Sequence, residues 1–217
     1  MPYSPGEYNT SMQELLLPLF PLEVVLFPRA DLALHIFEDR YKEMIADCLE
    51  HQREFGVVLI QENSLANIGC TAAISEVVRK YDDGRMDIVV RGTRRFEVLF
   101  LDRAKPYLRS AAQFFEDEGG AVTEGDGRRA QAIELFQQVT RLLESEESDA
   151  LAADDLQLSY RILARLPVDL SFKQSLLEIR SESERLTQVI AYLRKVTARL
   201  ELVTHTRAKA GGNGRRR

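Results

Sequence analysis

Three prolines near the start of the chain restrict its fold more than any other feature. Residues 15–41 consist of short apolar runs separated by Pro18, Pro21 and Pro28, and they read LLLPLFPLEVVLFPRADLALHIFEDRY. Proline lacks an amide donor and fixes one backbone torsion, so these runs cannot form a single helix. We predict short extended pieces instead, at residues 15–17, 24–27 and 32–36.

A helix is expected directly after these strands, because the apolar spacing changes at Glu38. From there, apolar side chains recur at the spacing of an amphipathic helix: Tyr41, Met44, Ile45, Cys48 and Leu49. We predict a helix over residues 39–51. A strand-rich opening that runs into one helix favours a closed β architecture over repeated strand–helix–strand units.

Residues 55–115 have the pattern of a small antiparallel barrel. The segment 82–85 (DDGR) separates two strand-like runs, and Asp-Gly favours a tight hairpin turn. Phe96, Val98 and Phe100 alternate along a later run, which places them on one face of a strand. The predicted strands are 55–60, 72–81, 86–91, 96–101 and 108–115. Several short strands with a single helix indicate an antiparallel barrel or a folded sheet.

The second half of the chain is predicted to be helical. An acidic, glycine-rich segment at 116–127 indicates a hinge. Ser171 and Gln174 have the spacing of a capping box, and Ser183 is a candidate cap for the last helix. The predicted helices cover 128–143, 154–166, 171–180 and a long stretch that begins near 183. Amphipathic helices with short connections must bury their apolar faces against one another, so we expect a four-helix bundle.

The chain is therefore predicted to be α+β, with two subdomains. The expected parts are a flexible arm (1–13), a β-rich subdomain (14–118), a linker (119–127), a helical-bundle subdomain (128–205) and a disordered basic tail (206–217). The tail holds five basic residues and no acid, so the net charge of −5 for the chain becomes −10 for residues 1–205. An acidic body disfavours binding to nucleic acid, because such binding depends on neutralising phosphates.

A series of short phrases follows in order along the chain. They are LPLFPLEVVLFP (17–28), LHIFEDRY (34–41), IGC (68–70), DGR (83–85), GTRRF (92–96), the pair Pro106–Tyr107, KQSLLE (173–178) and the pair Arg185–Leu186. Together they resemble the N-terminal substrate-binding (LON) domain of Lon proteases over roughly residues 15 to 200. The resemblance implies an N-terminal PUA-like antiparallel β pseudo-barrel with one helix, followed by the helical bundle. It also implies a stand-alone member without the ATPase and protease domains, and hence without catalytic activity.

Three positions depart from the pattern of that family. Glycine is common where Arg29 stands, proline where Ala33 stands, and an acidic residue near Ser181. Arg29 places a long charged side chain beside the opening strands. A ligand surface that the family has there would be altered in this chain.

We identify no catalytic residue, metal ligand or cofactor site in the sequence. It has no phosphate-binding loop, no HExxH motif and no cysteine pair at zinc spacing. His35 is either a general base or a hydrogen-bonding post between strands, and its apolar neighbours favour the post. Asp82, Asp83 and Asp87 fit a turn with its flanking strand better than a metal cluster.

The expected compartment is the cytoplasm. The N-terminus has no basic region followed by an apolar core, and no apolar run approaches the ~20 residues that span a bilayer. Cys48 lies on the apolar face of the predicted helix, and Cys70 precedes a strand. Two isolated, packed cysteines are typical of a reducing compartment.

The sequence predicts a surface that binds protein. A groove between barrel and bundle would be a concave site, and edge strands there are suited to strand addition by an extended peptide. The candidate peptide-binding residues are Phe27, Arg29, Leu32, Leu34, Ile36 and Phe37. By resemblance, the expected partners are unfolded or tagged protein segments, a protease or chaperone, and a second copy of the chain.

Three other functions stay open. Arg91, Arg94 and Arg95 form a small basic turn where an anion or an RNA phosphate would bind a PUA-like barrel, although a structural ion pair is favoured for Arg95. A small-ligand sensor would hold its ligand between barrel and bundle. An enzyme would need paired titratable groups in a deep pocket, and the sequence shows no such pair.

Overall fold

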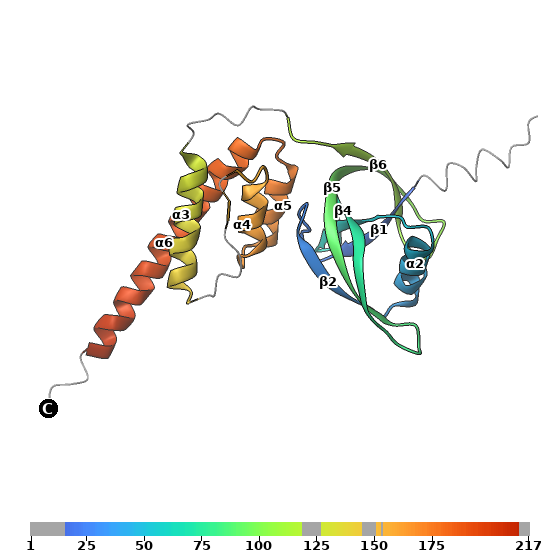
Figure 1. Cartoon of the computed structure of the whole chain (residues 1–217), viewed down its shortest axis with the longest axis horizontal. Coiled ribbons are helices and arrows are strands. Elements are labelled where there is room, and N and C mark those ends of the chain that lie inside the picture. The colour runs from blue at the N-terminus through green and yellow to red at the C-terminus, as the bar shows by residue number, and fades with distance from the viewer. Residues whose placement is uncertain (1–15, 119–126, 145–150, 153, 213–217) are drawn as a thin grey trace, which may run out of the picture. The chain divides into compact units, whose positions relative to one another are not determined.

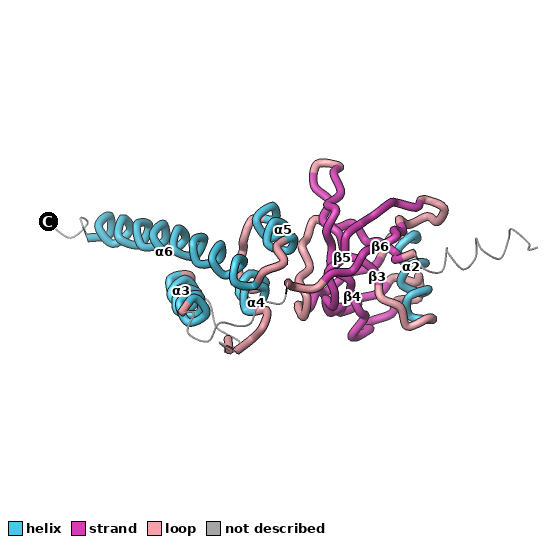
Figure 2. The backbone as a smooth tube through the Cα atoms, turned by 90° about the horizontal axis from the view of Figure 1, so that it is seen from above, coloured by secondary structure: helices cyan, strands magenta, loops and turns pink. Residues whose placement is uncertain are grey.

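The computed structural model describes residues 16–118, 127–144, 151–152 and 154–212, which fall into two compact units (Figure 1). The first unit contains the described residues up to Glu116 together with Val168–Glu178. The second contains the described residues of Asp117–Pro167 and those from Ile179 onward. Strands belong to the first unit and most helices to the second (Figure 2), so the predicted α+β class is confirmed.

Six strands form the sheet of the first unit. Their bounds are β1 Leu17–Leu22, β2 Asp31–Ile36, β3 Phe55–Gln61, β4 Ser64–Lys80, β5 Met86–Asp102 and β6 Arg109–Phe115. Their order is β2-β5-β4-β3-β1-β6, and β6 also pairs with β5, which closes five of the strands into a barrel. All pairs are antiparallel except β1 with β3, so the predicted antiparallel barrel contains one parallel pair.

Strand β1 runs through two of the prolines that we expected to end strands. Pro18 pairs with Arg109 of β6, and Pro21 pairs with Val58 of β3. Each proline lies where β1 has a strand partner on one side only, so its missing amide donor interrupts no second ladder. The predicted strand 24–27 is wrong, because this segment is irregular although most of its side chains are buried.

Helix α2 (Asp39–Glu50) forms where the apolar period predicts it. Its buried face consists of Tyr41, Met44, Ile45 and Cys48. These side chains join one hydrophobic core with inward residues of the strands, among them Phe20, Ile36, Phe55, Val57, Ile88 and Val90. The helix therefore lies against the barrel, as the labelled elements in Figure 1 show.

A close backbone approach fixes the segment that leads into β2. The Arg29 amide donates to the Gly92 carbonyl oxygen at 2.7 Å, and the Gly92 amide donates to the Ala30 carbonyl oxygen at 2.9 Å. A Cβ at Gly92 would lie 2.1 Å from the Phe27 carbonyl oxygen. Only glycine fits here, because any side chain would collide with backbone.

Helix α5 (Leu170–Glu178) belongs to the first unit, which corrects the predicted four-helix bundle. Gln174 Nε2 donates to the Ile68 carbonyl oxygen of β4 at 3.0 Å. Arg95 Nη1 of β5 donates to the Leu177 carbonyl oxygen, also at 3.0 Å. The apolar period of α5 indicates that it has a buried face, but it does not say which element covers that face.

The cap of α5 also differs from the prediction. Asp169 Oδ1 accepts hydrogen bonds from the amides of Ser171 (2.9 Å) and Phe172 (3.2 Å). Gln174, the expected partner in a capping box, contacts β4 instead. The charged carboxylate replaces the serine hydroxyl as cap because charge-assisted hydrogen bonds are stronger.

Helices α3 and α4 pack on α6 in the second unit. The bounds are α3 Arg128–Leu142, α4 Leu158–Ala164 and α6 Glu182–Gly212. Helix α4 is shorter than predicted, because Asp155 forms a turn before it and accepts a hydrogen bond from the Gln157 amide at 3.0 Å. At the start of α6, Ser181 rather than Ser183 is the cap, since Ser181 Oγ accepts from the Glu184 amide at 3.3 Å.

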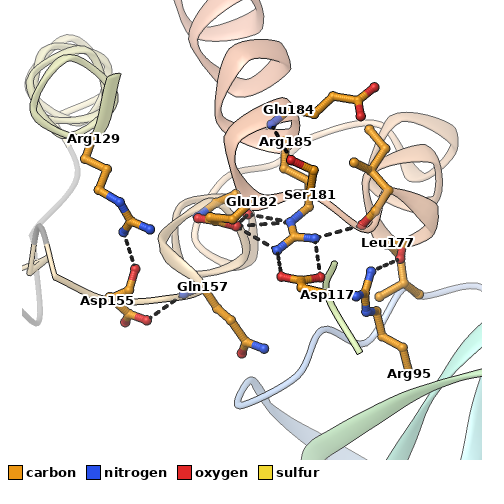
Figure 3. Close-up of polar contacts among 12 residues, drawn as sticks. Arg95, Asp117, Arg129, Asp155, Gln157, Leu177, Ser181, Glu182, Glu184 and Arg185 are labelled. Carbon is orange, nitrogen blue, oxygen red and sulfur yellow. Dashed lines mark hydrogen bonds and ion pairs between the residues drawn. The ribbon is translucent and has the colours of Figure 1, made fainter. Parts of the chain in front are cut away.

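A buried arginine joins the elements of the second unit (Figure 3). The Arg185 side chain is 0% exposed, and its guanidinium contacts the carboxylates of Asp117 and Glu182. It also donates to the Ile179 carbonyl oxygen at 2.7 Å and to Ser159 Oγ at 3.1 Å. Burial alone would lower the pKa of Arg185, but the neighbouring negative groups outweigh burial and the pKa is raised.

The predicted arm (1–13) and most of the predicted linker (119–127) lie outside the described residues. The backbone of α6 continues to Gly212. Residues 206–212 of the predicted disordered tail are therefore helical, and residues 213–217 lie outside the described part of the chain.

Candidate functional site

Strand β2 has an unpaired edge in the part of the sheet that the structure describes. It pairs with β5 from Asp31↔Arg91 to Ile36↔Met86, and it is the last strand in the sheet order. An unpaired edge presents a row of backbone N–H and C=O groups, to which an extended peptide can add as a further strand. β2 therefore offers the kind of edge that strand addition requires.

Side chains along β2 alternate between the core and solvent. Leu32 and Leu34 are half-buried against the main core, and Ile36 is buried. The alternate residues face outward, and the first of these, Asp31, accepts hydrogen bonds from Arg91 Nε (2.7 Å) and Nη2 (2.8 Å). The hydrogen bond from Arg91 lowers the pKa of Asp31, so this exposed carboxylate stays charged and fixed on the neighbouring strand.

Three aromatic rings lie at the C-terminal end of β2, and we call them the aromatic ridge: Phe37, His35 and Tyr81. Phe37 directly follows the strand and is 59% exposed. Its ring stacks on His35 with centroids 5.8 Å apart, and His35 meets Tyr81 edge-on at 6.1 Å. An exposed aromatic ring beside an unpaired strand edge is suited to anchor a side chain of an added peptide.

One carboxylate holds two rings of the aromatic ridge in place. Asp87 Oδ1 lies 2.6 Å from His35 Nδ1, and Asp87 Oδ2 accepts a hydrogen bond from the Tyr81 hydroxyl at 2.8 Å. The bond from His35, followed by that from Tyr81, lowers the pKa of Asp87, and donation to this carboxylate raises the pKa of Tyr81. His35 and Asp87 are opposite each other on β2 and β5, which confirms the predicted role of His35 as a post between strands.

The predicted peptide-binding residues differ in accessibility. Phe27 and Ile36 each expose only 1% of their surface, so neither side chain is accessible to a peptide in this structure. Their apolar side chains belong inside the barrel. Leu32 and Leu34 are half-buried, and Phe37 is exposed. The accessible part of the predicted surface therefore consists of the β2 backbone, Arg29 and Phe37.

Arg29 is exposed and has an unusual backbone conformation. Its φ of 64° lies in the left-handed region, which strains any residue with a Cβ. Glycine, which the resemblance leads us to expect at this position, would adopt this conformation without strain. The arginine keeps the turn before β2 and adds a charge beside the unpaired edge.

The three arginines of the predicted anion-binding turn each have a structural partner. Arg91 holds Asp31, and Arg94 Nη2 donates to Glu54 at 3.1 Å. Arg95 is buried, and its Nη1 donates to the Leu177 carbonyl oxygen of α5. The three guanidinium groups therefore contact three different parts of the chain: β2, the loop before β3, and α5.

A second exposed surface lies at the end of β5, and we call it the apolar ribbon: Leu99, Phe100 and Leu101. Leu99 is 56% and Phe100 52% exposed. We expected Phe100 to share a face with Phe96, which is buried, and this expectation is wrong. A β-bulge at Leu99 inserts one extra residue against β6. The side chains after the bulge therefore point to the opposite face of the sheet from the one that alternation predicts.

The model of one protein family covers most of the chain. The substrate-binding domain of ATP-dependent protease La (LON) matches residues 16–195. The chain belongs to this family. The earlier resemblance is thereby confirmed at the level of the domain.

Curated relatives of this Lon substrate-binding domain are much longer proteins. Lon protease of Escherichia coli (strain K12) is 24% identical over 191 residues, which is 82% of this chain and 24% of that protein. Lon protease 2 of Herpetosiphon aurantiacus is 26% identical over 203 residues, which is 87% of this chain and 25% of that protein. The domain thus spans about a quarter of the length of these relatives.

Two solved structures share the fold of this Lon substrate-binding domain. The Lon N-terminal domain protein from Xanthomonas campestris has a TM-score of 0.63 and 28% identity, over 82% of this chain and 98% of that one. The N-terminal domain of the Mycobacterium avium complex Lon protease has the same TM-score and coverage at 17% identity. The second likeness shows the fold alone.

Both cysteines of the domain lie in its interior. Cys48 and Cys70 are both free and buried, and burial raises the pKa of each thiol to about 12. Within the described residues, no group of His, Cys, Asp or Glu side chains could hold a metal ion. None of the described helices is both long enough and apolar enough to cross a membrane.

Two features of this site have little local signature in the sequence. The role of Tyr81 depends on the register of β2 with β5, which brings His35 opposite Asp87. The exposure of the apolar ribbon depends on a bulge. Its one local signal is four consecutive apolar residues, Val98–Leu101, in a strand where alternation was expected.

Proposed function

We propose that this chain is a non-catalytic recognition module that binds extended segments of unfolded or tagged protein along β2. The observation that carries the proposal is the unpaired edge of β2 beside the exposed ring of Phe37. Membership of a family named for substrate binding supports it.

Strand addition explains how such a module would accept many sequences. Backbone hydrogen bonds to β2 do not depend on the side chains of the added segment, whereas the aromatic ridge favours an apolar or aromatic residue near one end of it. Folded proteins keep such segments paired or buried. Unfolded chains, which expose them, would therefore be the preferred partners.

A more specific role for the module would use the same surface, the edge of β2 with Phe37. We propose that the module acts as an adaptor in protein quality control, with a protease or a chaperone as the downstream partner, and that its barrel is PUA-like. RNA binding is a weaker candidate, because Arg91, Arg94 and Arg95 already hold partners and residues 1–205 carry a net charge of −10.

The test uses a permanently unfolded probe, fluorescein-labelled lactalbumin that has been reduced and carboxymethylated. Fluorescence anisotropy measures its affinity for the full chain and for the Phe37→Ser variant. Loss of an exposed aromatic anchor should weaken binding about tenfold. Phe37 is exposed, so circular dichroism and Tm should stay close to those of the unsubstituted chain.

Phe100→Ser is the matched control, because Phe100 is similarly exposed but lies on the apolar ribbon. It should leave the affinity for the probe unchanged. The proposal is rejected if the full chain fails to bind the probe at about 100 µM. It is also rejected if both serine variants bind as well as the unsubstituted chain, or if only Phe100→Ser loses affinity.

A further inference from the structure

A polar groove lies between helix α5 and the hairpin of β3 and β4, and all of its residues belong to the first unit. Its volume is about 310 Å³. Leu59, which is buried, and Ala66, which is half-buried, give the groove some apolar surface. No residue of β2 or of the aromatic ridge lines it, so the groove is separate from the surface of the proposed function. Its remaining lining side chains are polar: Gln61, Ser64, Ser171, Gln174, Ser175 and Glu178.

The side-chain amide of Gln174 is held in one orientation. Its Nε2 donates to the Ile68 carbonyl oxygen and to Glu178 Oε1, each at 3.0 Å, so both amide hydrogens are used. A flipped amide would place oxygen against oxygen at both contacts. Gln174 Oε1 is therefore fixed in position, and it accepts no hydrogen bond from any described residue. Gln174 is only 8% exposed, and an acceptor buried this deeply is normally paired, so the groove has a place for a donor.

The other side chains of α5 in the groove are also acceptors. Glu178 Oε2 has no hydrogen-bond partner among the described residues. The Ser175 hydroxyl donates to the Phe172 carbonyl oxygen at 2.9 Å, and the Ser171 hydroxyl donates to Gln61 Oε1 at 3.5 Å. Because these hydrogens are used, the two hydroxyls offer only lone pairs to a ligand. The wall formed by α5 thus presents side-chain acceptors and no side-chain donor.

Glu178 gives the groove a negative charge that no lining residue neutralises. Neither lysine, arginine nor histidine lines the groove, and Gln61 and Ser64 on its opposite wall are neutral. Glu178 forms no ion pair with any described residue. The wider field is negative as well, since residues 1–205 carry a net charge of −10. A ligand that satisfies this groove is therefore a cation.

The side chain of arginine matches the groove in chemistry and in shape. A guanidinium group donates several hydrogen bonds and accepts none. Gln174 and Glu178 are neighbours one helical turn apart, and a planar guanidinium can donate to both at once. The alkyl stem of the arginine would pack on Leu59 and Ala66. A metal ion fits less well, because no group of described His, Cys, Asp or Glu side chains could hold one.

The groove suits an arginine within a polypeptide better than a small molecule. Free arginine carries a carboxylate, and no cationic residue lines the groove to bind it. A polyamine carries further ammonium groups, and Glu178 is the one carboxylate among the lining residues. An arginine inside a chain has neither of these extra charges.

We propose that the groove between α5 and the hairpin of β3 and β4 binds an arginine side chain of a partner polypeptide, with the guanidinium on Gln174 Oε1 and Glu178. The backbone of the partner would stay outside the groove, because the site holds a side chain rather than an extra strand. The proposal does not rest on polypeptide binding at β2.

An NMR titration of the full chain with a short peptide tests the proposal. The probe is an acetylated and amidated peptide of glycine and serine with one central arginine, so it offers no apolar side chain to the aromatic ridge. Its Kd should be on the order of 1 mM, as expected for one side chain in an open groove. The signals of Ser64, Ser175 and the Gln174 side-chain amide should shift. Replacement of the arginine by citrulline, which keeps the shape but loses the charge, should weaken binding at least about tenfold.

A substitution in the groove tests the role of the carboxylate. Glu178→Gln keeps the size of the side chain and removes its charge, so it should weaken binding of the arginine peptide at least about fivefold. Glu134→Gln, at an exposed position of α3 outside the groove, is the matched control and should bind the peptide as the unsubstituted chain does. The citrulline comparison requires no variant, so it tests the charge even if Glu178→Gln alters the fold.

Four results would overturn the proposal. The first is the absence of any shift in the groove at about 10 mM arginine peptide. The second is equal affinity for the arginine and citrulline peptides. The third is unchanged affinity in Glu178→Gln. The fourth is tighter binding of free arginine than of the peptide, which would assign the groove to a small molecule instead of a polypeptide.

Discussion

At the scale of single residues, the junction between Phe27 and Gly92 is the tightest constraint on the surface around β2. The amide and carbonyl groups of Gly92 both bond to the segment that leads into β2, and no room exists for a side chain. A residue with a Cβ must push this segment away from β5. The position of β2, and with it the unpaired edge, depends on this glycine.

We predict that Gly92→Ala destabilises the chain by about 3 kcal/mol, because the new Cβ would collide with the Phe27 carbonyl oxygen rather than with a flexible side chain. Chemical denaturation followed by circular dichroism measures the change. Gly127→Ala is the control, since a Cβ at Gly127 meets nothing within 4 Å, and it should change stability by less than about 1 kcal/mol. Equal effects of the two alanines would contradict this account.

Sequence patterns predicted the special backbone position at Arg29 but not the burial of Phe27. The glycine preference at position 29 was known from the resemblance, and the φ of 64° at Arg29 supplies its physical cause. The burial of Phe27 was not predictable from its neighbours, because an irregular segment has no period that distinguishes inside from outside.

At the scale of secondary-structure elements, local patterns predicted whether most elements are helices or strands, but not which elements pack against them. Helix α2 was predicted correctly because its apolar period is strong and is covered by one core. The extent of strand β1 was predicted wrongly at its prolines. A proline destabilises a strand only where a second strand lies alongside and needs its missing amide donor. That information is tertiary and has no local signature.

For helix α5 too, the local pattern predicted the element but not its packing partner. Its apolar face was predicted, but it lies in the unit of the barrel, where Gln174 and Leu177 bond to β4 and β5. An amphipathic helix packs equally well on a sheet or on other helices. The apolar ribbon of β5 was missed because a bulge breaks the two-residue alternation on which strand predictions rest.

At the scale of the whole molecule, the chain has two units with separate means of stabilisation. The first unit has a large apolar core shared by the barrel and α2. The second buries apolar side chains of α3, α4 and α6, and it also has an ionic network in which Arg185 joins Asp117, Ser159, Ile179 and Glu182. Removal of one member of a buried ionic network leaves the others without compensation.

We predict that Arg185→Met destabilises the second unit by about 3 kcal/mol, because the half-buried carboxylates of Asp117 and Glu182 would lose their cation. Hydrogen exchange detected by mass spectrometry should show faster exchange in α4 and α6 and unchanged exchange in β3 and β4. Arg194→Met, at an exposed position of the same helix, is the control and should leave both patterns unchanged. Unaltered exchange in α4 of the Arg185 variant would contradict this role.

The central claim is that an extended polypeptide adds to the unpaired edge of β2. Residue-resolved amide exchange by NMR, with and without the carboxymethylated lactalbumin probe, tests it most directly. We predict that the outward-facing amides of Asp31–Ile36, which pair with no described strand, exchange more slowly when the probe is bound. Bound probe with unchanged exchange along β2 would contradict the account and place the binding surface elsewhere.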